Sequence, residues 1–295
     1  MDLVAGMRAL IAVVEEGSFS GAAERLDISK AMISKQISSL EAHLGTRLLN
    51  RTTRRLSLTE SGTLFYERSL QILADISEAE QAAGGLTARP RGTLKMTVPL
   101  TYAQHKLVPV FAAYRQAYPE VRLDIHAGDR KLDLVEEGFD MAIRIGILPE
   151  SGLVARKLDG VRSVVCASPA YIEKHGKPVT PQDLVRHECM AYSLSQSSEE
   201  WRLLDAQGNA HVVRCSGAVR ADNGDLLRLA ALEGEGIVFQ PGFIVQDDLD
   251  KQRLIRLLPD FASDELGVYA VYPSRQYLSA KVRSFVDFVA QALAE

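Results

Sequence analysis

The sequence predicts an α/β protein in which a small helical N-terminal domain, a long helix and a larger domain of alternating strands and helices follow one another. Three observations predict this organisation. Apolar residues recur at helical spacing in three short segments within the first 45 residues. One continuous helical pattern then covers residues 59–83, and strand and helix patterns alternate beyond residue 92. At 295 residues the chain is also long for a single core.

Composition and charge narrow the class of protein. Apolar residues make up 46% and charged residues 24%, which is ordinary for a globular protein. No run approaches the roughly 18 apolar residues of a membrane span, so we expect no membrane partner. The N-terminus, MDLVAGMRAL, has an acid at its second position and lacks a basic segment before an apolar core. We therefore expect no signal peptide and a cytoplasmic location.

The chain contains three widely spaced cysteines, Cys166, Cys189 and Cys215. Their odd number and spacing fit neither a disulfide framework nor a metal site, and they favour a reducing compartment. We expect buried, unreactive thiols, with a redox-sensing pair as the alternative. No cofactor is predicted.

The first 45 residues predict a helix-turn-helix unit. Residues 2–16 form an amphipathic helix, and GSFSGAAERL predicts a short second helix capped by Ser18 or Ser20. LDI is a tight connection, Ser29 can cap the third helix, and Gly45 suits the left-handed position at its end. Three short helices with a tight turn between the second and third match this unit.

The third helix has one apolar side and one polar side of short residues. At about 100° per residue, the apolar stripe that must face the core consists of Ile33, Ile37, Leu40 and Leu44. The opposite side presents Ala31, Ser34, Lys35 and Ser38, with Lys30 and Ser39 at its edges. Short side chains let a helix enter a DNA major groove, where Ser, Lys and Gln hydrogen-bond with base edges or phosphates. Two alternative interpretations fit this face less well. A face that is merely solvated would carry charges of mixed sign, and a serine–lysine hydrolase would need a cleft around the nucleophile.

A basic segment surrounds this helix. From Ser29 to Arg55 the chain has six basic residues against one glutamate, although the whole protein has a net charge of −4. Within it, RLLNRTTRRLSLT predicts two short extended segments around a basic turn, which is a β-hairpin or wing. A local positive patch on an acidic protein favours an anionic polymer as the partner of one face.

The helix predicted at 59–83 has a narrow apolar seam. Its residues recur at alternating steps of three and four: Phe65, Ser69, Ile72, Ile76, Ala79 and Ala83. A long helix with such a seam typically pairs with a partner helix, so we expect a dimer. Packing of the helix on its own chain is the alternative. Gly84-Gly85 and ARPRG at 88–92 predict a linker.

Strands and helices alternate beyond the linker. LKMTVPL, VRLDIHAG and DMAIRIG predict strands, and HKLVPVFAAYRQAYP and LDLVEEG predict helices between them. A second set has the strands RSVVCAS, WRLLDA, HVVRCSG and GIVFQ and the helices PAYIEKHG and DLLRLAALEG. The chain ends with the strand LGVYAVYP and the amphipathic helix LSAKVRSFVDFVAQAL. The alternation predicts a parallel α/β sheet.

The N-terminal region resembles the winged helix-turn-helix of the LysR-type transcriptional regulators. The resemblance rests on the spacing of GSFS, AAERL, the S-x-x-x-x-S-x-Q-I helix, LE-x-x-LG-x-RL and RTTRRLSLTE-x-G. It covers the first 60 residues closely. FDMAIRIG, ASPAYIEKHGKPVTPQDLVRHECM and LEGEGIVFQPGFIVQDDL resemble the effector domain of the same family. Ala31 departs from the family pattern, which often has proline there, and this leaves base preference at that point open.

The resemblance implies three parts: a winged helix-turn-helix DNA-binding domain at 1–58, a linker and dimerisation helix at 59–90, and an effector-binding regulatory domain at 91–295. It also implies that the regulatory domain has two lobes like a type 2 periplasmic solute-binding protein, with a small-molecule effector between them. The expected lobes are 91–162 with 267–295, and 163–266.

Position by position, the resemblance implies a DNA-binding surface on the helices and the wing. Its helical residues are Ser18, Ser29, Lys30, Ala31, Ser34, Lys35, Gln36 and Ser38, and its wing residues are Arg51, Thr52, Thr53, Arg54 and Arg55. Arginines in a wing suit phosphate contact or insertion into a narrow minor groove.

Effector-binding residues are expected where strands end and helices begin, at the carboxyl edge of the sheet. The candidates are Thr101, Arg144, Gly146, Ser168, Asp222, Asn223, Gly224, Phe239 and Gln240. The Thr101 hydroxyl suits a carboxylate, and Arg144 can clamp an anion, so an anionic effector is one expectation.

Simpler roles stay open for several of these candidates. Arg144 can pair with Asp140 instead, and Ser168, Asp222 and Asn223 can cap helices. His105 and His126 are expected at the surface or in packing, because no second ligand lies at metal spacing.

We therefore expect a LysR-type transcriptional regulator that binds an imperfect palindromic operator as a homodimer or homotetramer. Contact with RNA polymerase is left open. A regulator switched by thiol oxidation is one alternative, and a solute-binding protein is another, although the basic N-terminal module speaks against the latter. The sequence contains no catalytic triad, metal set or phosphate loop, so we do not expect an enzyme.

Overall fold

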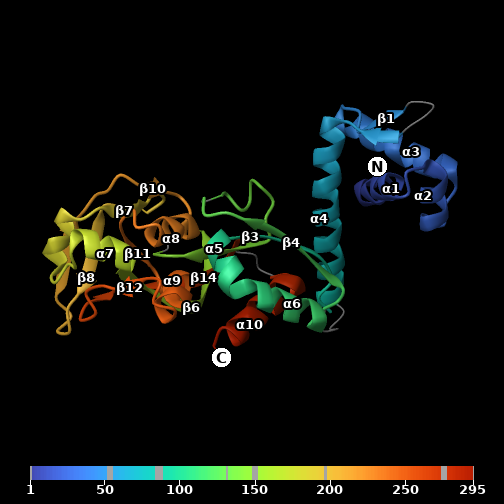
Figure 1. Ribbon diagram of the computed structural model, residues 1–295. Coiled ribbons are helices and arrows are strands. Elements are labelled where there is room, and N and C mark those ends of the chain that lie inside the picture. Colours follow the sequence, from blue (N-terminus) through green and yellow to red (C-terminus); the bar gives the residue numbers. More distant parts are fainter. Residues whose placement is uncertain are drawn as a thin grey trace. The chain divides into compact units, whose positions relative to one another are not determined.

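The computed structural model describes residues 2–51, 56–83, 89–130, 132–147, 152–195, 198–273 and 278–294 (Figure 1). The chain divides into two compact units, Met1–Arg89 and Pro90–Glu295, which we describe separately. In the described ranges, none of the helices combines the length and the apolar character that crossing a membrane requires.

The described residues of the first unit form four helices and a small hairpin. Its elements are α1 (Leu3–Glu15), α2 (Phe19–Leu26), α3 (Lys30–Leu44), β1 (Leu49–Arg51), β2 (Leu56–Leu58) and α4 (Glu60–Ala83), and β1 and β2 pair antiparallel. Side-chain caps begin the first three helices: Asp2, Ser18 and Ser29 each accept from a backbone N–H three residues on. Gly45 ends α3 at a φ of 67°, the left-handed position expected of a helix-terminating glycine.

The core of this unit is formed by α1, α2 and the predicted stripe of α3. Ile33, Ile37 and Leu40 are fully buried, which confirms the side of α3 that turns inward. Phe65 of α4 packs against the same core, so its apolar side chain is already in contact within its own chain. Phe65 is therefore removed from the predicted dimer seam.

At Gly62 the chain comes very close to the residue before β1, because a Cβ would lie 1.9 Å from the Leu48 carbonyl oxygen.

The second unit is built on one mixed sheet. In its described residues nine strands join in the order β10-β7-β11-β6-β14-β5-β3-β4, with β12 paired to β6. The strands are β3 (Gly92–Val98), β4 (Val121–Ala127), β5 (Met141–Ile145), β6 (Leu153–Ala167), β7 (Cys189–Tyr192), β10 (Arg220–Ala221), β11 (Ile237–Pro241), β12 (Ile255–Arg256) and β14 (Glu265–Pro273). A small separate sheet contains β8 (Glu200–Leu204), β9 (Ala210–Arg214) and β13 (Ala262–Ser263).

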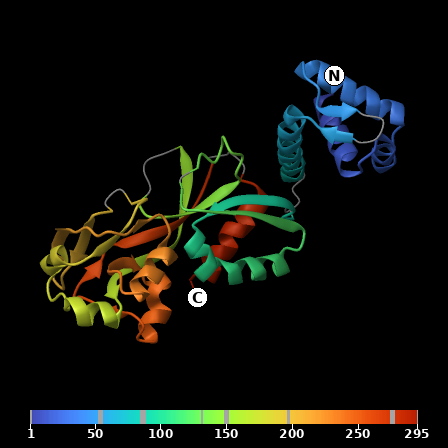
Figure 2. The same ribbon diagram turned by 45° about the horizontal axis from the view of Figure 1, so that its top comes forward.

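Helices cover this sheet in two groups. The first group is α5 (Leu100–Tyr102), a π-helix (Ala103–Leu107), α6 (Val108–Ala117) and α10 (Ala280–Ala292). Figures 1 and 2 show α6 and α10 side by side, and Tyr114 of α6 stacks edge-on against Phe285 of α10 at 5.0 Å between ring centroids. The second group is α7 (Pro169–His175), a 3-10 helix (Pro181–Arg186), α8 (Gly224–Leu232) and α9 (Gly242–Asp250).

Separate apolar cores define two lobes in this unit. We call β3, β4 and β5 with α5, α6 and α10 lobe I, and β7, β10 and β11 with α7, α8 and α9 lobe II. Strand β6 serves both, because its first part pairs with β14 and its last residues pair with β11. It passes from one pairing to the other at Arg162–Ser163.

Two predictions about this unit are wrong. The sheet is not wholly parallel: β3 pairs in parallel with β4 and β5, and β7 with β10 and β11, but β14 and β6 run antiparallel to their neighbours. LDLVEEG forms turns instead of a helix. The segment ends at Gly138 with a φ of 69°, and it is too short to offset the cost of starting a helix.

A buried ion pair fixes α10 to lobe I. The Lys281 ammonium lies 2.8 Å from the Asp140 carboxylate and donates to the Thr93 carbonyl at 2.6 Å, and Asp140 also accepts from the Lys95 N–H. Both charged side chains are about 5% exposed. Such a pair contributes little net stability, but removal of one partner leaves the other charge buried and unpaired.

We expect Lys281→Met to lower the free energy of unfolding of the second unit by about 3–5 kcal/mol, because the Asp140 carboxylate loses its buried ion pair with Lys281. Denaturant unfolding followed by circular dichroism measures this. The control is Lys157→Met, which removes an exposed partner of Glu265 and should cost at most about 1 kcal/mol. Equal losses in both variants would contradict a special role for the buried pair.

Candidate functional site

The outward side of α3 presents the residues that the sequence predicted. Ala31, Lys35 and Ser38 are exposed, and Ser34 is half-buried beside them. Lys30 is exposed at the first position of the helix. Gln36 points partly inward, since its Oε1 is buried and has no hydrogen-bond partner among the described residues. The face is therefore narrow and built of short or basic side chains.

The one acid of the basic segment is turned away from this face. Glu41 accepts from the backbone N–H groups of Leu48 and Leu49, at 2.9 and 3.2 Å, and so holds the start of the hairpin to α3. Its carboxylate is therefore bound to backbone donors beside the hairpin. The charged residues on the outward side of α3 are Lys30 and Lys35, so that side is positive.

Ser18 and Ser29 each combine an exposed position with a structural role. The Ser18 hydroxyl accepts from the Gly21 N–H at 3.0 Å, and the Ser29 hydroxyl from the Met32 N–H at 3.2 Å. Arg51 lies in β1, and the predicted wing residues Thr52, Thr53, Arg54 and Arg55 lie outside the described residues.

In lobe I, three polar side chains collect where parallel strands end. Thr101 follows β3, Asp129 follows β4, and Arg144 lies near the end of β5. The Leu100 N–H donates to Asp129 at 3.1 Å, which ties the β4 end to the start of α5. Thr101 is 4% exposed, and its hydroxyl lacks a hydrogen-bond partner within the described ranges.

Lobe II brings its own strand ends to the same place. Tyr192 ends β7, Gly224 follows β10, and Gln240 lies at the end of β11. A Cβ on Gly224 would lie 3.2 Å from the Gln240 Oε1 and 3.8 Å from the Thr101 Oγ1, so these three residues meet across the lobes. A hydrogen bond between the Tyr192 hydroxyl and Asp129 also crosses the lobes. We call these six residues, Thr101, Asp129, Arg144, Tyr192, Gly224 and Gln240, the interlobe site.

The charge of Arg144 is the unusual feature of the interlobe site. Both terminal nitrogens of its guanidinium are buried, and neither has a hydrogen-bond partner in the part of the chain that the structure describes. Burial lowers the pKa of Arg144, and the nearby Asp129 acts in the opposite direction. Burial likewise raises the pKa of Asp129, against hydrogen bonds from Tyr192 and the Leu100 N–H. Burying a cation without a hydrogen-bonded partner costs roughly several kcal/mol of folding free energy. An anion placed against the cation recovers that cost.

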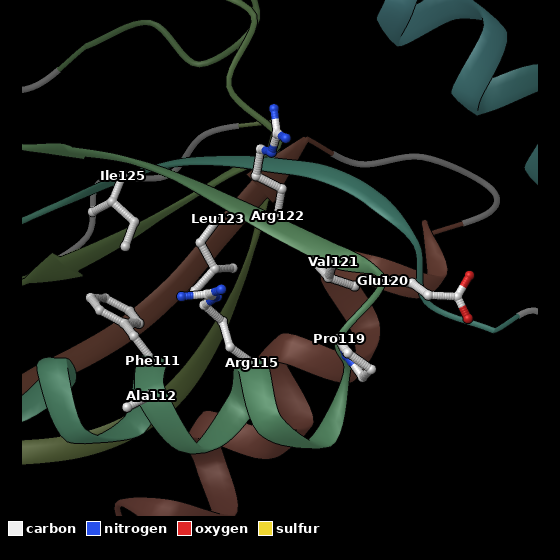
Figure 3. Close-up of a pocket in the computed structure, with 9 residues that line it drawn as sticks. All are labelled: Phe111, Ala112, Arg115, Pro119, Glu120, Val121, Arg122, Leu123 and Ile125. Atoms are coloured by element: carbon white, nitrogen blue, oxygen red, sulfur yellow. The ribbon is translucent and has the colours of Figure 1, made fainter.

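A separate open groove of about 770 Å³ lies on lobe I between α6 and β4 (Figure 3). Phe111, Arg115 and Leu123 are among the side chains that line it. None of the predicted effector residues does so.

Comparison with known proteins identifies both units. Residues 4–63 match the model of the bacterial regulatory helix-turn-helix proteins of the lysR family, and residues 87–294 match that of the LysR substrate binding domain. The HTH-type transcriptional regulator CrgA of Neisseria meningitidis serogroup B is 38% identical over 284 residues, which cover 96% of this chain and 94% of CrgA. This chain belongs to the LysR family of transcriptional regulators.

Solved structures of LysR-type regulators agree with this assignment. The structure of CrgA from Neisseria meningitidis has 36% sequence identity and a TM-score of 0.63, and the match covers 98% of each chain. Full-length AphB, a virulence activator of Vibrio cholerae, has 29% identity and a TM-score of 0.61, with 99% of each chain covered. The LysR-type chain described here therefore binds DNA through its helix-turn-helix, takes a small-molecule effector in its second unit and is not an enzyme.

Two predicted effector residues of this LysR-type regulator lie elsewhere. Ser168 is buried and caps α7, where its hydroxyl accepts from the Tyr171 N–H at 3.3 Å. Phe239 packs against Trp201 in the core of lobe II, with 5.4 Å between ring centroids. Neither contact involves a residue of the interlobe site, and an effector role for these two positions stays a prediction.

The structure also describes the surroundings of Asn223, Gly146, Asp222 and Asp140. Asn223 caps α8 by accepting from the Leu226 N–H at 2.9 Å, and the Gly146 N–H donates to the Gly267 carbonyl at 3.0 Å. Asp222 is exposed, and its charge raises the pKa of Asp129. The alternative partner of Arg144, Asp140, is instead occupied by Lys281.

Asp129 and Tyr192 were not among the predicted effector residues. Asp129 comes directly after VRLDIHAG, so the strand-end rule applied to this predicted strand would have included it. Tyr192 ends β7, a strand of four residues that was not predicted, so the rule could not have found it.

The thiols of this LysR-type chain are in unreactive surroundings. Cys166, Cys189 and Cys215 are all free and buried. Burial, with a smaller effect from Asp248, raises the pKa of Cys166 to about 12. A hydrogen bond with Cys215, followed by burial, raises the pKa of Cys189. Since the thiolate is the reactive form, these surroundings do not favour the thiol-oxidation alternative.

We expect the native protein to react with an aromatic disulfide reagent far more slowly than free cysteine does, and all three thiols to react after unfolding in urea. Absorbance of the released thiolate measures both rates. Glu173→Cys, at an exposed position of α7, provides a reactive control. Rapid reaction of a native thiol, with loss of DNA binding, would restore the redox interpretation.

Proposed function

We propose that the interlobe site binds an anionic small-molecule effector, with Arg144 and Thr101 as the residues that hold its negative group. The observation that carries this proposal is the buried Arg144 guanidinium, whose terminal nitrogens lack partners in the described ranges. Arginine offers a planar pair of donors that matches a carboxylate or phosphate. The Thr101 hydroxyl adds a second buried group that has no hydrogen-bond partner among the described residues.

The rest of the interlobe site limits what the effector can be. Asp129 lies near Arg144, and Asp222 adds a further negative charge near Asp129. A ligand with one anionic group against Arg144 is favoured over one with several, since further negative groups would approach these carboxylates. Gln240 and Tyr192 offer hydrogen-bonding groups for the neutral part of the ligand.

We expect Arg144→Met to weaken anion binding about 10- to 100-fold, because a hydrogen-bonded ion pair is lost. The probes are acetate, benzoate, succinate and inorganic phosphate, with acetamide and benzamide as uncharged counterparts. Thermal unfolding of the full chain over a range of probe concentrations gives each affinity. Arg115→Met, in the groove of Figure 3, is the matched control.

At least one anion should stabilise the wild-type protein and the Arg115→Met protein more than its uncharged counterpart does. Equal stabilisation of the Arg144→Met protein would contradict the assignment of Arg144. Stabilisation by the uncharged probes alone would contradict an anionic effector.

For DNA, we propose that α3 enters the major groove with Ala31, Ser34, Lys35 and Ser38 facing the bases and phosphates, and that the wing contacts the adjacent backbone. The exposed, acid-free side of α3 supports this. Two heads in a dimer would read related half-sites, so we propose an imperfect palindromic operator and action in the cytoplasm.

We propose that α4 supplies the dimer contact. Ile72 of the predicted seam is a large apolar residue with 39% exposure, and it supports a helix that pairs with a second copy. Effector binding would then favour one arrangement of the two heads over another, which is a shift between existing populations. Operator footprints with and without a verified effector would test this shift.

We expect Lys35→Gln to weaken binding to any DNA sequence and to lower the slope of log affinity against log salt concentration by about 0.9 for each DNA-binding head that is bound, the effect of one phosphate contact per head. Fluorescence anisotropy with a labelled duplex of random sequence measures the slope. Lys174→Gln, at an exposed position of α7, is the control. An unchanged slope for Lys35→Gln would show that Lys35 does not contact phosphate.

A further inference from the structure

A histidine–aspartate pair joins the two lobes beside the interlobe site. His105 belongs to the π-helix Ala103–Leu107 of lobe I, four residues after Thr101. Asp225 belongs to α8 of lobe II and directly follows Gly224. The His105 Nε2 lies 3.3 Å from both carboxylate oxygens of Asp225. Each partner is thus attached to an element that also carries a residue of the interlobe site.

Two other histidine–aspartate pairs among the described residues stay within one part of the fold. His126 lies 3.2 Å from Asp124 on the same strand, β4. His211 of β9 lies 3.1 Å from Asp205, six residues earlier in the chain. Protonation of His126 or His211 would change a contact within one part of the fold and not a contact between the lobes. These two pairs are therefore internal comparisons for the pair of His105 and Asp225.

Lobe II holds its half of the pair firmly. The Asp225 carboxylate also accepts from the Arg228 Nε at 3.0 Å, and Arg228 donates to the buried Asp248 of α9 at 2.8 Å. Arg253 lies 2.6 Å from the other oxygen of Asp248 and extends this series of ion pairs. Asp225 is therefore fixed in lobe II with its charge shared between Arg228 and His105.

His105 is the partner that can change. Its side chain is 33% exposed, so protons reach it from solvent. The ring of Phe243, on α9, packs near it at 6.1 Å between centroids, and Phe243 also contacts Tyr102 at 5.1 Å. Lys106, the next residue along the π-helix, is exposed. Among the described residues, the charged groups linked to the imidazole are Asp225 and, through it, Arg228 on α8, and Lys106 is its neighbour in the chain.

We propose that His105 and Asp225 form a proton-dependent bridge that holds the lobes together and so positions Thr101 against Gly224 and Gln240. A protonated imidazole forms an ion pair with Asp225, whereas a neutral one forms a single, weaker hydrogen bond. Acid therefore favours the closed arrangement, and this advantage is lost when the imidazole gives up its proton in base. The consequence for effector affinity rests on the proposed function, because a ligand of the interlobe site binds more tightly when more of the protein is closed.

The bridge is tested without any ligand by hydrogen–deuterium exchange and mass spectrometry of the full-length chain. Exchange of peptides covering residues 100–107 and 222–228, corrected for the intrinsic effect of pH, reports how often the lobes separate. At pH 6, His105→Gln should speed exchange of both peptides by roughly two- to fivefold, the effect of losing a partly exposed ion pair. At pH 8 the variant and the wild-type protein should differ little.

His105→Lys separates charge from a merely structural role. A lysine stays charged at both pH values, so this variant should keep both peptides protected at pH 8 and lose the pH dependence. His126→Gln, which changes a pair within lobe I, is the matched control and should leave both peptides unchanged. The proposal is overturned if His105→Gln exchanges like the wild-type protein at pH 6, or if His105→Lys keeps the pH dependence of the wild-type protein.

Failure of this proposal and failure of the proposed function are distinguishable. The exchange experiment contains no anion, so its result does not depend on Arg144. Arg144→Met should keep the pH-dependent protection even if it loses every anion. A normal anion response with no pH-dependent protection would overturn the bridge alone.

Discussion

The backbone ladder of β6 determines the geometry of the whole second unit. This strand of 15 residues pairs with β14 over its first part and with β11 over its end, both antiparallel. Because β5 is antiparallel to β14, the strands of lobe I run in the direction of β6, and their carboxyl ends point towards lobe II. Because β11 is antiparallel to β6, the parallel strands of lobe II point the opposite way. The two carboxyl edges must therefore face each other, and the interlobe site is the place where they meet.

Local patterns in the sequence predicted the first unit well. The stripe of Ile33, Ile37 and Leu40 could be recognised because a helix places residues three and four apart on one side, and burial of that side decides the fold. The caps at Ser18 and Ser29 are equally local, since each joins a side chain to a backbone group three residues away. Ala31 remains the residue on this face where the family pattern is broken.

Long-range arrangement limited what the sequence could predict. The strand-end rule located the edge at which Thr101, Gly224 and Gln240 meet, but it does not say which of two neighbouring side chains turns to that edge. On β11, Gln240 turns to the interlobe site while Phe239 turns to Trp201, because successive residues of a strand point to opposite sides. The antiparallel directions of β6 and β14 and the pairing of Asp140 with Lys281, 141 residues apart, depend on contacts that no local pattern records.

The proposed role of Arg144 would also link the lifetime of the protein to its ligand. Within the described residues the terminal nitrogens of Arg144 are buried without hydrogen-bond partners, which makes the fold less stable than an apolar residue at the same place would, and selection for stability alone would remove such a charge. Ligand that binds only the folded form restores stability in proportion to its concentration. Because unfolded chains are degraded in cells, the amount of this regulator, and not only its activity, would rise and fall with the supply of the molecule it detects.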